Sequence, residues 1–172
     1  MCNSECCTSI CMSIAALLLV LSSVAANAAD NPRYIMSVDT NGPGTQELLA
    51  GDYDTAIERA SLSQFKNSLA AHLTLCSAQI GLGNYHEAEP SCDAAVKLAK
   101  SSVVTARKAQ GERDREGLAK AYSNRAILNR LLQRHQAAEQ DFALSLRQKR
   151  QQNTIKHNRD IALVNTMTAS TD

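Results

Sequence analysis

The sequence predicts an all-helical fold of stacked helix pairs, and three observations lead to it. A Gly-polar-Tyr-x-x-Ala stretch occurs at residues 51–56 and again at residues 83–88, and an echo at a fixed period is typical of stacked supersecondary units. From Thr45 onward the apolar residues recur at helical spacings. No alternating β-branched run bounded by turns is present, so we expect no strands.

The beginning of the chain, 1–28, is interpreted as an export signal. Residues 13–26 form an apolar run that is shorter than the roughly 20 residues a membrane helix needs. Ala26-Asn27-Ala28 follows as a small-x-small cleavage site before Ala29. We therefore expect a periplasmic or secreted protein with no stable membrane insertion after cleavage, and an uncleaved anchor is the alternative. A start at Met12 in place of Met1 would remove the cysteine-rich beginning, which carries no Lys or Arg.

The helical part is expected to span residues 45–165. Residues 29–44 should be irregular, because Gly42-Pro43-Gly44 breaks any regular element. Residues 67–82 place apolar side chains at spacings of three and four, which predicts a helix. Gly83 then ends that helix, so the order is helix, tight turn, helix.

The pairs resemble the tetratricopeptide repeat family, and residues 119–146 carry the best match. Tyr122 stands at the Trp position of the family pattern, Ala126 at the small Gly position, and Ala138-x3-Phe142 keeps the A-x3-F spacing. A second copy places His72 at the Trp position, and the first copy has only residues 45–50 as its first helix. The resemblance implies a right-handed superhelical stack of antiparallel helix pairs, an α-solenoid of about three repeats with the first one partial.

The spacing between the copies predicts an insertion. The interval from Gly51 to Gly83 is close to the family period of about 34 residues. The interval from Gly83 to its counterpart Gln133 exceeds that period by about 16 residues. The excess lies at about 100–117, where we expect a longer helix and then a polar loop at 111–114. Residues 151–164 should form a helix that covers the last repeat, because an array needs a terminal cap. Residues 166–172 are expected to be a flexible tail.

The resemblance also implies a function, a non-enzymatic protein-interaction module whose first helices line a concave groove for a peptide or partner protein. Lys120 and Asn124 resemble part of the family's carboxylate clamp. With Arg130, Lys120 favours a partner that has an acidic segment or a free carboxyl terminus, because charge-assisted hydrogen bonds are the stronger kind. Carried over to this sequence, the groove would be lined by Ala70, Leu73, Ser77, Ile80, Lys120, Ser123, Asn124, Ile127 and Arg130.

One group of side chains offers other chemistry. His72 and Cys76 lie one turn apart, and Cys92 projects from the facing helix at nearly the same level. The favoured interpretation is that all three are core residues, since free Cys packs as a small hydrophobe. A Cys76–Cys92 disulfide is the first alternative, with Cα atoms expected near the limit of roughly 7 Å for such a bond. A redox or three-ligand metal site is the second alternative; we expect no metal and no cofactor.

Other function classes receive little support. The sequence has no phosphate-binding Gly loop, HExxH, CxxC or GxSxG motif, so we expect no enzyme. Residues 30–96 carry 3 basic and 9 acidic side chains, and residues 97–172 carry 15 and 7. The basic half lacks interleaved aromatics, so we interpret it as a solvated face and expect no nucleic-acid partner. Self-assembly through the incomplete first repeat is a third hypothesis, and the oligomeric state is left open.

Overall fold

The regular secondary structure in the described part of the chain is helical, which confirms the predicted all-α class. The computed structural model describes residues 34–105, 110–149 and 153–168, and the expected export signal lies outside them. No strand occurs in these ranges, and no helix in them is long and apolar enough to cross a membrane. The α-helices are α1 (Thr45–Leu49), α2 (Tyr53–Ala60), α3 (Leu69–Gly81), α4 (Tyr85–Thr105), α5 (Gly111–Leu131), α6 (His135–Gln148) and α7 (Asn153–Thr168), and a 3-10 turn spans Ser63–Phe65.

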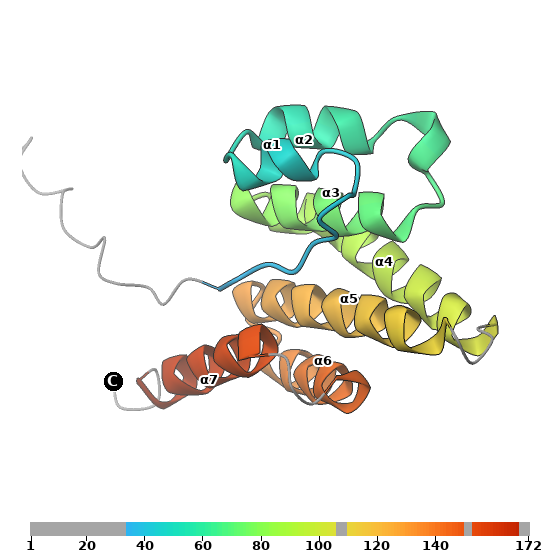
Figure 1. Ribbon diagram of the computed structural model, residues 1–172. Coiled ribbons are helices and arrows are strands. Elements are labelled where there is room, and N and C mark those ends of the chain that lie inside the picture. The colour runs from blue at the N-terminus through green and yellow to red at the C-terminus, as the bar shows by residue number, and fades with distance from the viewer. Residues whose placement is uncertain (1–33, 106–109, 150–152, 169–172) are drawn as a thin grey trace, which may run out of the picture. The chain divides into compact units, whose positions relative to one another are not determined.

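Short turns join consecutive helices into packed pairs. α3 packs on α4 and α5 on α6, and a tight turn links the helices of each pair (Figure 1). The turns use the same backbone conformation, with positive φ angles of 82° at Gly51, 80° at Gly83 and 61° at Gln133. A left-handed residue just past a helix end is a common way to satisfy its last carbonyls. The sequence analysis took these same three residues as counterparts in the three copies of the repeat.

Small side chains fill the contacts between paired helices. Cys76 and Ala88 are fully buried in one cluster, and Ala126 and Phe142 are fully buried in another. Alanine and cysteine at these places let the helix axes approach closely. Phe142 is therefore one of the few large groups in a core otherwise built from small and aliphatic residues.

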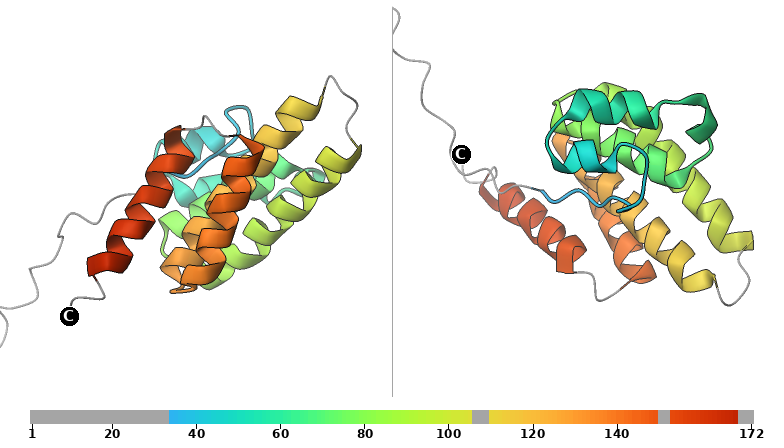
Figure 2. Two further views of the ribbon diagram at one scale, coloured as in Figure 1. Left: turned by 90° about the horizontal axis from the view of Figure 1, so that it is seen from below. Right: turned by 45° about the horizontal axis from the view of Figure 1, so that its top comes forward.

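The extra residues of the middle copy lengthen two helices. α4 runs to Thr105, as the spacing predicted, but Gly111–Asp114 form the first turn of α5 and not the expected polar loop. The added turns of α4 and α5 lie side by side at one end of the helical part (Figure 2). Glu112 and Asp114 suit a first turn, because acidic side chains there favour the helix dipole.

α7 covers the third pair, as the sequence predicted. It packs on α6 and α5, and its Ala162 is buried in one cluster with Ala126, Ile127 and Phe142. Ile155 and Ile161 of the same helix are also buried. The helix continues to Thr168, so the first residues of the segment predicted as a flexible tail are helical, and residues 169–172 lie outside the described part.

Candidate functional site

The N-terminal segment of residues 34–39 is not helical, and hydrogen bonds hold it to α5 and α7. In Figure 1 this segment runs as a stretched chain past α5 toward α7. Asn124 of α5 holds it at Ser37, where the side-chain Oδ1 accepts from the Ser37 N–H at 2.8 Å and Nδ2 donates to the Ser37 carbonyl at 2.7 Å. Asn124 Nδ2 also lies 3.2 Å from Ser77 Oγ of α3. One amide thus joins the segment to two helices.

A second asparagine repeats this contact two residues earlier in the segment. Asn158 of α7 accepts from the Ile35 N–H and donates to the Ile35 carbonyl, both at 2.8 Å. The interval from Asn124 to Asn158 matches the period of the resembled family, about 34 residues. Both asparagines are fully buried. Both asparagines bind only backbone atoms of the segment, so these hydrogen bonds do not depend on which side chains stand at positions 35 and 37.

A threonine pair fixes the far end of the segment. Thr45 Oγ1 donates to the Asp39 carbonyl at 2.8 Å and lies 3.3 Å from Thr74 Oγ1 of α3. The chain then turns through Gly44, whose φ is 74°. Any larger residue there would bring its Cβ into a clash with the Ala56 carbonyl oxygen. The segment is therefore held at Ile35, Ser37 and Asp39, every second residue.

Met36, which lies between two held residues, and Tyr34 pack against the core. Met36 packs against both buried clusters, the one around the Cys76–Cys92 pair and the one around Phe142. Tyr34 packs against the Phe142 cluster, whereas Ile35 is 48% exposed. This alternation is what an extended chain produces, because its successive side chains point to opposite sides.

The structure buries most of the residues that the sequence assigned to an open groove. Leu73, Ser77, Ser123, Asn124, Ile127 and Arg130 are buried, and Ala70, Ile80 and Lys120 are partly buried. Asn124 and Ser77 contact the chain's own segment or the amide that holds it. Residues 34–39 therefore contact part of this set: Asn124 binds Ser37, and Met36 packs in the clusters that contain Ile80 and Ile127.

The two cations proposed for an acidic partner already have neighbours. Lys120 forms an ion pair with Glu116 at 3.4 Å. Arg130 is only 9% exposed, and its guanidinium contacts the His135 ring. Arg130 is therefore not an exposed groove cation, whereas Lys120 is partly exposed and paired with Glu116. The preference for an acidic partner stays a prediction.

Cys76 and Cys92 form a disulfide that ties α3 to α4. Their Cα atoms are 4.9 Å apart, closer than the sequence argument expected. The His72 ring contacts the backbone instead, with Nε2 3.0 Å from the Lys66 carbonyl oxygen. The described residues contain no group of three side chains suited to a metal, and sulfurs bonded to each other are not thiolate ligands. The favoured interpretation of two free core cysteines is wrong in this structure, although both side chains are buried.

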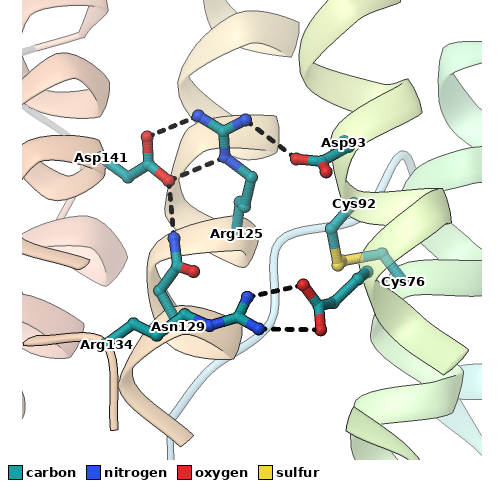
Figure 3. Close-up of polar contacts among 8 residues, drawn as sticks. Cys76, Cys92, Asp93, Arg125, Asn129, Arg134 and Asp141 are labelled. Atoms are coloured by element: carbon teal, nitrogen blue, oxygen red, sulfur yellow. Dashed lines mark hydrogen bonds and ion pairs between the residues drawn. A yellow bond between two sulfur atoms is a disulfide. The ribbon is translucent and has the colours of Figure 1, made fainter. Parts of the chain in front are cut away.

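A charged pocket of about 230 Å³ lies between α4, α5 and α6 (Figure 3). Arg125 binds both carboxylate oxygens of Asp141 at 2.8 Å and one of Asp93 at 3.0 Å. Asn129 donates to Asp141 at 3.1 Å. The hydrogen bond from Arg125 to Asp141 is the main reason that the pKa of Arg125 is raised. These interactions join α5 to α6 through Asp141 and to α4 through Asp93.

A second ion pair closes the same pocket. Arg134 binds Glu89 through two contacts, of 2.5 and 3.1 Å, which join the turn before α6 to α4 (Figure 3). The hydrogen bond from Arg134 lowers the pKa of Glu89. Both side chains are partly exposed, so this pair contributes little to stability.

Sequence reasoning missed the residues that hold the segment and those that line the charged pocket. Asn158 could have been found, because it repeats Asn124 at the family period. Met36 and Arg125 gave no local signal, since neither belongs to a motif. Comparison with protein-family models, curated proteins and solved structures finds no match for this chain.

Proposed function

We propose that the protein is an exported, non-enzymatic interaction module whose groove holds an extended peptide by its main chain. The observation that carries the proposal is the double hydrogen bond of Asn124 to Ser37, repeated by Asn158 at Ile35. A side-chain amide that binds both backbone groups of one residue supplies the donor and the acceptor that a neighbouring strand would supply. Such a site recognises an extended chain and not a helix, whose own hydrogen bonds use these groups.

A tetratricopeptide-type solenoid is the architecture that we propose for this module. The left-handed turn residues at the three aligned positions support it, as does the recurrence of the asparagine, at Asn124 and Asn158, at the family period. In this interpretation α3, α5 and α7 are the first helices of successive repeats. The segment then crosses the stack by contacting one first helix after another.

Export is supported by the Cys76–Cys92 disulfide. Disulfides persist in oxidising compartments and are rare where thiols are kept reduced. The bond ties two helices of one pair and lies beneath the segment, next to Met36. It therefore suits a structural role in the floor of the groove.

The occupant in this structure is the chain's own segment of residues 34–39, held at high effective concentration by the turn that follows. A free peptide competes poorly against a tethered one, so the test must remove the tether. Thr40 and Asn41 are exposed, and a protease site inserted between them allows the folded chain to be cut there. The cut leaves the segment bound without a covalent link to the helices.

The experiment adds a large excess of a labelled peptide, RYIMSVDT, which copies residues 33–40. We expect fluorescence anisotropy to report its incorporation into the cut protein. Asn124→Asp should weaken that binding by at least about tenfold, since the loss of one buried hydrogen bond and a buried charge together exceed about 1.4 kcal/mol. Asn84→Asp, at an exposed position, is the matched control. Failure of the peptide to enter the cut protein would refute the proposed function.

A further inference from the structure

We infer that the groove selects its partner by sequence, and that the partner is an extended segment with an aromatic-x-methionine-x pattern that enters with its N-terminal end at α7. This inference rests on the proposed function and specifies its ligand. The evidence is the way in which the two asparagines and the two buried clusters act on the same stretch, Tyr34 to Ser37.

The asparagines fix the register of the bound chain. Asn158 binds Ile35 and Asn124 binds Ser37, so two residues of any occupant must present both backbone groups to the amides. In an extended chain the residue between them presents its backbone groups to the other side, and its side chain is opposite those of its neighbours. A shift by one residue would exchange the buried and exposed side chains. The amides therefore dictate which side chains meet the core.

The core under the segment is apolar and closely packed. Met36 contacts the cluster of Cys76, Ala88, Cys92 and Leu128, and also the cluster that contains Phe142. A long unbranched side chain suits a seat between two clusters, because methionine adapts to irregular gaps. A charged side chain there would lose its hydration with no partner. The side chain at the position of Met36 is therefore the one that decides which peptides bind.

The neighbouring positions make different demands. Tyr34 rests on the Phe142 cluster, so an aromatic or large apolar residue is favoured there. Ile35 is 48% exposed and is held only through its backbone, so its side chain is free to vary. This contrast provides a matched pair of substitutions, one at Met36 and one at Ile35, of the same chemistry in the same peptide.

The test measures competition by peptides against labelled RYIMSVDT on the cut protein. A Met36→Asp peptide should bind at least about tenfold more weakly, since the partly buried methionine loses its apolar contacts and the carboxylate that replaces it loses hydration against two apolar clusters. The Ile35→Asp peptide should bind within about threefold of the parent, as exposed positions contribute little. A Met36→Leu peptide should also stay within about tenfold, because the volume is conserved.

The outcomes separate the two proposals. If the parent peptide binds and the two aspartate peptides bind equally well, sequence selection is refuted while main-chain binding stands. If the parent peptide does not bind, the proposed function fails first. Should the cut protein precipitate, the intact chain replaces it: Met36→Asp should open the groove to labelled parent peptide, and Ile35→Asp should not. Binding to both variants, or to neither with helicity retained, would overturn the inference.

Discussion

Replacing Asn124 by aspartate changes one group at the point where α5 binds the backbone of Ser37. The new carboxylate keeps the acceptor for the Ser37 N–H but turns an oxygen toward the Ser37 carbonyl, which now receives a hydrogen bond of 2.7 Å from the amide. The lost donor costs about 1 kcal/mol. The site is fully buried, so the carboxylate loses its hydration as well. Burial raises the pKa of this carboxyl group. A rise of about two to three pH units lowers the free energy of unfolding by a further ~3–4 kcal/mol at pH 7.

The pH dependence of the stability of Asn124→Asp shows whether the buried carboxylate causes the loss. A carboxyl group whose folded pKa is raised above the unfolded value of about 3.9 binds more protons in the folded state, so stability falls as pH rises between the two values. We expect the free energy of unfolding of Asn124→Asp to be about 4–5 kcal/mol below that of the wild type at pH 7, and within about 1–2 kcal/mol of it near pH 4. Urea unfolding followed by circular dichroism measures both, with Asn84→Asp as control. A loss of stability below about 1 kcal/mol at pH 7 would refute the inference that Asn124 holds the backbone of Ser37.

Three further changes test the rest of the fold. Phe142→Ala should lower the free energy of unfolding by about 3–5 kcal/mol, because the ring is fully buried, and a loss below about 1 kcal/mol in chemical denaturation would contradict that burial. Replacing Cys76 and Cys92 together by Ala should cost about 2–4 kcal/mol, since the bond closes a loop of sequence separation 16; unfolding unaffected by this change or by a reductant would exclude a structural disulfide. Glu116 accepts a hydrogen bond from Lys149, which lowers the pKa of Glu116, so its stabilising effect is present above the unfolded value of about 4.5 and is lost as pH falls through the folded value. Urea midpoints of Glu116→Gln should therefore converge with the wild type in acid, and a difference that is the same at all pH values would exclude this pair as its source.

The helices could be predicted because their signals are local. Apolar spacing and a turn glycine indicated the α3–α4 pair, and the structure has both. The polar stretch Gly111–Asp114 was wrongly expected to be a loop, because composition alone cannot distinguish a loop from the exposed first turn of a helix. In the structure the lengthened α5 packs on α4, and tertiary contacts of this kind commonly override local propensity.

The binding of residues 34–39 to α5 and α7 could not be predicted from local patterns. Ser37 and Asn124 are 87 residues apart, and Ile35 and Asn158 are 123 apart. Residues 34–39 have neither helical periodicity nor a motif, so they gave no sign of the surface on which they lie. The sequence did single out Asn124 through the family resemblance, but it assigned that amide to an external peptide. The structure shows the same amide bound to the chain itself.

Amide hydrogen exchange of the intact chain tests the central claim most directly. Ile35 and Ser37 lie outside any helix, yet their N–H groups are bound by buried asparagines. We predict that both amides exchange slowly in the native protein, as amides in stable structure do, and that Asn124→Ala releases Ser37 while the amides of α5 stay protected. Fast exchange at both Ile35 and Ser37 in the wild-type protein would show that the segment is not held in the groove, and it would contradict the account.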